Sequence, residues 1–203
     1  MKNLAILILL ILSVKMTKAQ TEEFVYPGLI RTQGTLCAGS MLQQKVTHFY
    51  FHGALEGYLN KLISFTGENY IHLGNTSPDF AYPVSHSLFF GSNIHYVKDR
   101  LDIYIGIQPG VCYAHLKNLN LIQIPETTFD SWSLNPLISG TVGCNFFVSK
   151  LFDFFVNARV IHGNYLSQIK FTDNQVSSMG HGFQVPLDEI RISAGLGWHF
   201  GKI

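Results

Sequence analysis

Hydrolysis of an acyl chain needs a nucleophilic hydroxyl or thiol beside a general base, and two segments of the sequence come near that arrangement. His86 and Ser87 are adjacent, but neighbouring side chains on a strand point to opposite faces, which argues against a dyad. His162 is followed by Gly163 and Asn164, neither of which carries a hydroxyl. Neither segment predicts a working nucleophile, so we expect no enzyme activity.

Three cysteines, Cys37, Cys112 and Cys144, lie far apart and fall on separate predicted strands. An odd number cannot pair completely within one chain, and this spacing argues against a disulfide framework. No Cys-x-x-Cys motif or close group of Cys with His occurs, so the spacing does not predict a zinc site. We expect neither a metal nor an organic cofactor.

The N-terminus has the form of a cleaved secretion signal. Lys2 precedes an apolar run over residues 4–12, and Thr17-Lys18-Ala19 follows that run before Gln20. The run is about half of the roughly 20 residues that a membrane-spanning helix needs. We therefore predict a signal peptide over residues 1–19, cleaved after Ala19, and one domain over residues 20–203.

The charge and composition favour a surface that faces lipid. Removal of residues 1–19 takes away three of the 14 basic residues and none of the 13 acidic ones, which leaves a net charge near −2. This charge gives no sign of a nucleic-acid partner. Charged residues make up only 13% of the chain, against a usual figure of about 25%, whereas Phe, Tyr and Gly are plentiful.

Short polar turns alternate with longer polar segments between strand-like stretches. The turns lie at 60–62, 98–101 and 149–151, and the longer segments, at 74–83, 117–133 and 172–187, carry residues typical of exposed loops. We therefore predict an all-β fold, an eight-stranded antiparallel up-and-down transmembrane β-barrel. In bacterial outer-membrane barrels an even strand number places both termini in the periplasm, which here puts the short turns there and the long segments outside. The predicted strands are 29–38, 46–58, 62–73, 84–97, 101–115, 135–148, 152–166 and 188–200, with the connection at 39–45 the least defined.

Alternation of side chains assigns the two faces of several strands. On the last strand Ile190, Ile192 and Trp198 share one face and Arg191 and His199 the other. A basic residue on the lipid face near the midplane costs about 2–4 kcal/mol, so the polar face must point inward. The predicted inward residues are Glu56, Asp102, Asp153, Arg159, Glu189 and Arg191, with His52, Asn157 and His199 beside them.

Side chains roughly fill the interior of an eight-stranded barrel, so a wide pore is not expected. Charges in such an interior need partners, and we expect a lumen polar network paired between neighbouring strands. Arg159 and Glu189 are one predicted pair. The alternative is a path for protons or small ions through the same network.

Three segments resemble the small outer-membrane β-barrel proteins of the Bacteroidota, the PorT-like group. Residues 99–113 are similar to that family's short turn followed by a strand with a central glycine-aromatic step, 149–159 resembles a second such unit, and 195–200 resembles its closing strand. The resemblance implies a noncatalytic, porin-like protein of the bacterial outer membrane with a structural, interaction or secretion-accessory role. It also implies contact with outer-membrane lipid, a possible partner in a secretion assembly, and a C-terminal signal at Trp198 and Phe200 for the barrel-assembly machinery.

Two alternatives stay open. Residues 158–164 resemble the His-x-Ser-Asn strand motif of the lipid A deacylases, which implies a lipid A-modifying acyl hydrolase, but Asn164 stands where that motif has its serine. The other alternative is a soluble secreted lipocalin-like barrel that binds an apolar ligand.

Overall fold

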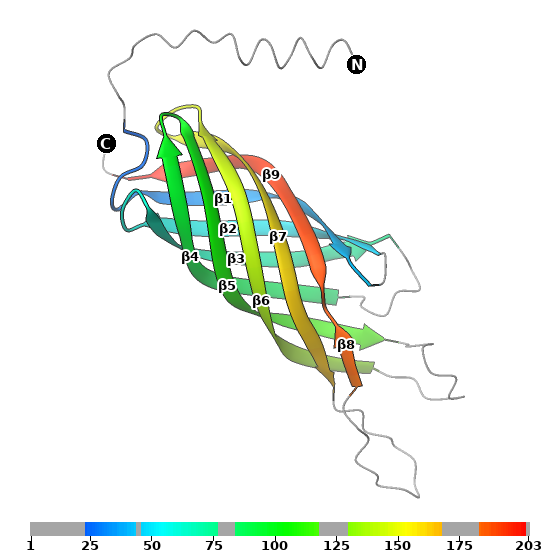
Figure 1. Ribbon diagram of the computed structural model, residues 1–203. Helices are drawn as coiled ribbons and strands as arrows, with labels where there is room; N and C mark the ends of the chain where they lie inside the picture. The colour runs from blue at the N-terminus through cyan, green and yellow to red at the C-terminus, as the bar shows by residue number, and fades with distance from the viewer. Residues whose placement is uncertain (1–22, 44–45, 77–83, 118–129, 168–182, 202–203) are drawn as a thin grey trace, which may run out of the picture.

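The computed structural model describes residues 23–43, 46–76, 84–117, 130–167 and 183–201, and these form one closed antiparallel barrel (Figure 1). Each strand pairs with its neighbours in the sheet, and β1 pairs with β9, which closes the barrel. In this part of the chain, no helix is long and apolar enough to cross a membrane. The strands are β1 (Ile30–Met41), β2 (Thr47–Tyr58), β3 (Ile63–Asn75), β4 (Val84–Lys98), β5 (Leu101–Lys117), β6 (Asp130–Phe147), β7 (Phe152–Ser167), β8 (Phe183–Pro186) and β9 (Glu189–Phe200).

The prediction of an eight-stranded barrel is confirmed, because β8 and β9 together occupy the position of the eighth strand. Both pair with β7, β8 along residues 164–167 and β9 along residues 152–161. The predicted last strand thus begins earlier and is interrupted at Leu187 and Asp188. The predicted first strand also ends too early, since Gly39 and Ser40 still pair with both β2 and β9.

The three short turns and both described ends of the chain lie at one end of the barrel, which we call the turn end; the opposite end is the loop end (Figure 1). Side chains shape two of these turns. Asn60 Oδ1 accepts hydrogen bonds from the backbone N–H groups of Leu62 (2.7 Å) and Ile63 (2.9 Å). Ser149 Oγ accepts one from the N–H of Leu151 at 3.1 Å.

A cluster of apolar side chains closes the barrel interior at the turn end. The segment before β1 folds back so that Phe24, Val25 and Leu29 are buried against Tyr58 and Phe147. The Phe24 and Phe147 rings stack with their centroids 5.5 Å apart. The hydrogen bond from the N–H of Tyr58 to the carbonyl of Leu29 (2.9 Å) fixes the segment at the rim. These five residues form the turn-end cap, which separates the barrel interior from the space outside the turn end.

The ladder between β6 and β7 stops short of the loop end. Its last pair is Leu137 with Gly163. The next residue on β6 is Pro136, which has no N–H to donate. Beyond it the N–H of Leu166 donates to the side-chain oxygen of Asn135 at 2.7 Å. A side chain thus replaces the backbone bond where the ladder is interrupted.

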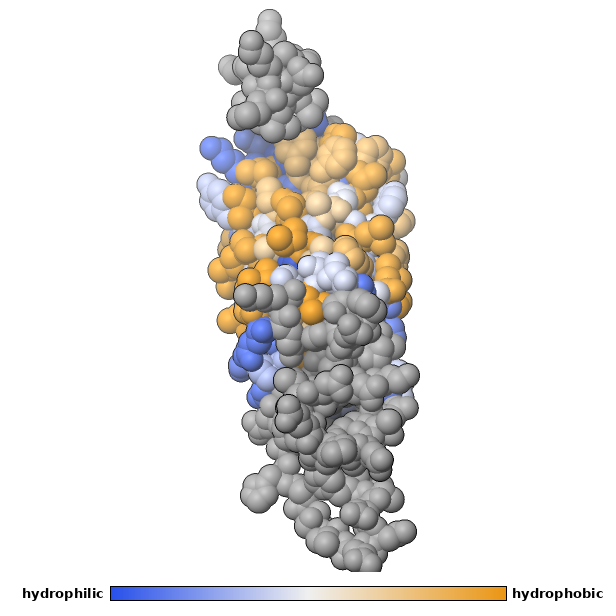
Figure 2. Space-filling view, turned by 90° about the vertical axis from the view of Figure 1, so that its right-hand side faces the viewer, coloured by the Kyte–Doolittle hydropathy of each residue, from blue (hydrophilic) through white to orange (hydrophobic). Residues whose placement is uncertain are grey.

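The two faces of the sheet differ as the alternation predicted. On β5, Ile103, Ile105 and Ile107 are exposed, whereas Asp102 and Gln108 are fully buried. Figure 2 shows apolar residues covering the barrel wall in a broad band, with hydrophilic residues towards both ends. The wall is therefore apolar outside and polar inside.

Candidate functional site

The barrel interior holds charged side chains in three layers along its axis, each built on one arginine and one glutamate. The first lies near the turn end, the second midway and the third near the loop end, as their positions along the strands require. All of these charges are buried, so each depends on its protein partners rather than on water. The pairs are Arg31 with Glu56, Arg159 with Glu68, and Arg191 with Glu189.

The turn-end layer centres on Glu56. Its carboxylate pairs with the Arg31 guanidinium, which lies directly opposite on β1. It also accepts hydrogen bonds from Ser64 Oγ and from Asn93 Nδ2, the latter at 2.9 Å. Arg31 Nη1 lies 3.8 Å from Asp153 Oδ2, which links β1 to β7 across the interior. Five strands, β1, β2, β3, β4 and β7, therefore meet through these side chains.

Two further carboxylates in this layer each hold an imidazole. Asp102 lies 2.8 Å from His95 Nδ1 and accepts a hydrogen bond from the Tyr58 hydroxyl at 2.7 Å. Asp153 Oδ1 lies 2.6 Å from His199 Nε2. The buried residues include three arginines against five carboxylates, and these two carboxylates are the excess.

The middle layer centres on Arg159. Its guanidinium pairs with Glu68, donates from Nη1 to Ser139 Oγ at 2.6 Å, and donates from Nε to the Tyr70 hydroxyl at 3.2 Å. His52 Nε2 lies 3.0 Å from Glu68 on the other side. Each N–H-bearing nitrogen of Arg159 therefore has its own acceptor, a geometry that lowers the cost of burying the charge.

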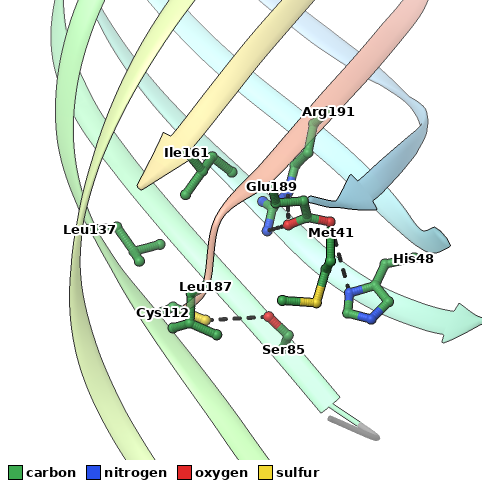
Figure 3. Close-up of a pocket in the computed structure, with 9 residues that line it drawn as sticks. All are labelled: Met41, His48, Ser85, Cys112, Leu137, Ile161, Leu187, Glu189 and Arg191. Carbon is green, nitrogen blue, oxygen red and sulfur yellow. Dashed lines mark hydrogen bonds and ion pairs between the residues drawn. The ribbon is translucent and has the colours of Figure 1, made fainter. Parts of the chain in front are cut away.

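The loop-end layer lines a small pocket (Figure 3). Arg191 donates to Glu189 from Nε at 2.8 Å and to Ser87 Oγ from Nη1 at 2.6 Å, and the Tyr50 hydroxyl donates to Glu189 at 2.9 Å. The pocket has a volume of about 10 Å³, which is room for one water molecule. Its remaining lining is mostly apolar, from Met41, Leu137, Ile161 and Leu187. A pocket of this size does not fit an organic ligand.

Amide side chains separate the titratable groups of the turn-end layer from those of the middle layer. Asn93 Nδ2 donates to Glu56, and Gln108 Nε2 donates to Asn93 Oδ1 (3.3 Å) and to Glu68 (3.2 Å). A carboxamide neither takes up nor releases a proton near neutral pH, and the guanidinium of Arg159 stays protonated. This geometry favours a structural network over the predicted alternative of a proton path.

The structure buries all nine residues that the sequence assigned to the inward face, and their function stays a prediction. The predicted pair of Arg159 with Glu189 is wrong. Arg159 lies opposite Arg191 in the register of β7 and β9, and it pairs with Glu68 on β3. Glu189 pairs instead with Arg191, two residues along the same strand.

Sequence reasoning missed Arg31, Glu68 and His95, which complete the layers. The signal was the same alternation, since Glu68 shares its side of β3 with Ser64, Thr66 and Tyr70. His95 likewise lies opposite the apolar face of β4. The face on which a side chain lies can thus be predicted from the sequence, but its partner cannot. Arg159 and Glu68 lie 91 residues apart, and their contact crosses the barrel.

The histidine of the predicted hydrolase motif lies on the outer face. His162 is largely exposed, and its Nδ1 lies 2.7 Å from Asp188 Oδ1. Within the described residues no hydroxyl or thiol hydrogen-bonds to His162, so the pair has a base and an acid without a nucleophile. Cys37, Cys112 and Cys144 are free thiols, and the same residues include no group of three His, Cys, Asp or Glu placed to hold a metal ion.

No family model matches the chain, and no curated protein sequence matches it either. The solved structures that share its fold include outer membrane protein OprG from Pseudomonas aeruginosa (TM-score 0.64, 7% identity, 87% of this chain and 98% of that chain), Neisserial surface protein A (0.55, 12%, 85% and 96%), and the N-terminal β-barrel domain of Pseudomonas aeruginosa OprF (0.53, 8%, 86% and 98%). At these identities the likeness concerns the fold alone, which is that of small outer-membrane β-barrels.

Proposed function

We propose that this protein is a noncatalytic β-barrel of the bacterial outer membrane that presents its loops and outer wall to other molecules. One observation carries the proposal: among the described residues, the outer face of the barrel is mostly apolar, while the charges inside are paired with one another. A soluble barrel would need the opposite arrangement, with an apolar interior and a polar exterior.

The exposed apolar side chains are large and continuous around the wall. Ile107 is 72% exposed, Leu36 71% and Tyr96 65%. Apolar patches of this extent mark contact with lipid or protein. A closed barrel also satisfies its backbone polar groups between strands, as hydrocarbon demands. The same sorting argues against the soluble lipocalin-like alternative, whose apolar ligand would need an apolar interior.

Aromatic side chains at the loop end support a membrane boundary there. The Trp132 ring stacks between Tyr113, with centroids 4.8 Å apart, and His115, at 4.3 Å. Trp132 and Tyr113 are both about half exposed on the outer wall. Tryptophan and tyrosine are enriched at membrane–water interfaces. This stack is where we place the outer edge of the apolar band.

The finer parts of the proposal concern export and assembly. The predicted signal peptide, residues 1–19, lies outside the described residues. Trp198 and Phe200 are 47% and 57% exposed on the outer face of β9 at the turn end, a position open to the barrel-assembly machinery. We extend the resemblance to the PorT-like group to a secretion-accessory role, with a protein of a secretion assembly as the partner.

Cell fractionation tests the location. We expect the protein in the outer-membrane fraction, and we expect its migration in detergent gels to change on heating, because a closed barrel resists detergent until it unfolds. Recovery in the aqueous fraction without detergent would contradict the proposal. Mass analysis of lipid A with and without the protein tests the noncatalytic part, since a gained or lost acyl chain would show an enzyme.

A charged residue in the closing strand tests the assembly signal. We expect Phe200→Asp to reduce the amount of folded protein in the outer membrane. Leu151→Asp is the matched control, because Leu151 is also 57% exposed at the turn end but lies in a turn. Normal insertion of Phe200→Asp would show that Phe200 is not part of the signal.

A further inference from the structure

Asn69 is a carboxamide in the middle of the apolar wall. It alternates with the buried residues Glu68 and Tyr70, so its side chain points outward, and it is exposed. It lies six residues from either end of β3, which places it near mid-height of the barrel. Its outward neighbours across the ladders are Gly53 and Leu88. Within the described residues its amide has no hydrogen-bond partner.

Glycines lie beside this amide on the outer wall. A Cβ atom placed on Gly53 would lie 2.5 Å from Asn69 Oδ1, so the amide lies over Gly53 in space that any other side chain would fill. Gly53 in turn pairs with Gly34 on β1, beside the ring of Phe51. The amide of Asn69 thus lies over the backbone of Gly53, and neither Gly34 nor Gly53 adds a side chain of its own to this part of the wall.

Few groups can reach an amide at this depth, if the barrel spans the membrane as proposed. The hydrocarbon core of a bilayer is about 30 Å thick, so lipid head groups lie far above and below mid-height. The ladders hold the backbone groups of β2, β3 and β4 around it. An amide without a partner in hydrocarbon is costly, and such polar residues mark contacts between membrane segments. A polar group on another protein at the same depth would supply the missing partner.

We propose that the outer face of β1, β2 and β3 around Asn69 is the contact surface for a second copy of this chain. A two-fold axis along the membrane normal brings Asn69 of each copy to the same depth and face to face. The carboxamide carries both a donor and an acceptor, so two of them complete each other. Gly34 and Gly53 add no side chains of their own beside the amide, and small residues favour lateral packing in membranes.

Disulfide cross-linking in isolated outer membranes tests the contact. In a Cys144→Ser background, which removes the native thiol on the outer face of β6, we expect Ile71→Cys to form covalent dimers under mild oxidation, because Ile71 is exposed beside Asn69 on the outer face of β3 and the change leaves the amide intact. Ile107→Cys is the matched control, because Ile107 is exposed in the wall on β5, away from the proposed contact. Monomeric Ile71→Cys, equal cross-linking of both variants, or a product with a different protein would overturn the inference.

A second measurement separates the amide from the surface around it. In lipid vesicles, energy transfer between labelled copies should show at least a tenfold weaker dimer for Asn69→Leu, with unchanged heat-modified migration. Unchanged association of Asn69→Leu would overturn the role of the amide. A protein that fractionates with the outer membrane but remains monomeric would contradict this inference alone, whereas recovery in the aqueous fraction would contradict the proposed function.

Discussion

The interior and the outer wall of this barrel are built from alternate residues of the same strands, yet they obey different rules. Inside, each nitrogen of the Arg159 guanidinium donates to its own acceptor, on Tyr70, Ser139 or Glu68. Outside, Ile107 is 72% exposed and only has to be apolar. Each interior position therefore requires a particular side chain, whereas an outer position requires only an apolar one.

The largest effect should follow from breaking one interior pair. Arg159→Met leaves Glu68 buried without its guanidinium, which should lower the free energy of unfolding by about 3–5 kcal/mol. The double variant Arg159→Met with Glu68→Met should recover most of that loss, since neither charge then stays unpaired. Urea unfolding of the barrel in detergent micelles measures both. A loss below about 1 kcal/mol for the single variant would contradict the requirement for pairing.

A charge placed on the wall should cost somewhat less. Ile105→Arg puts a guanidinium on the lipid side of β5 and should cost about 2–4 kcal/mol. Tyr96→Arg, nearer the turn end of β4, should cost only about 0–1 kcal/mol because its head group can reach the interface. Equilibrium unfolding from lipid vesicles compares them. Equal costs at the two depths would argue that this wall does not face a bilayer.

Adding one methyl group at a glycine of β6 should affect stability differently on the two faces. A Cβ on Gly143 would lie 2.3 Å from Cζ of the Tyr104 ring, so Gly143→Ala should cost about 1–3 kcal/mol. Gly140 faces outward with no atom within 4 Å of such a Cβ, so Gly140→Ala should be close to neutral. Thermal unfolding in micelles measures the pair, and equal stability of the two variants would show that the interior is loosely packed.

The smallest effect should come from an ion pair outside both faces. Lys61 pairs with Glu23 at the turn end of the barrel, and both side chains are more than half exposed. Lys61→Met should change the unfolding free energy by less than about 1 kcal/mol, and salt should reduce even that difference. The same urea titrations measure it. A loss as large as that of Arg159→Met would mean that the segment before β1 carries much of the stability.

The alternation of side chains made the barrel and its two faces predictable, because period two is a local property of each strand. The partners inside were not predictable. Arg159 and Glu189 share a face on neighbouring strands, but the register places Arg159 opposite Arg191, and no residue pattern states that register. The missed extension at residues 130–134 has a different cause: its polar residues are typical of loops, and only pairing with β5 makes them a strand.

The pairing of β1 with β9 has a consequence for the order in which the barrel can form. Ile30 meets Phe200, so the first strand has no partner on one side until the last residues of the chain have been made. Contacts so distant in sequence form late, because the whole chain must first be brought together. Until then both strands have open edges that could pair with another molecule. Folding is therefore completed by β9, and a truncation that removes β9 leaves β1 and β7 with unpaired edges.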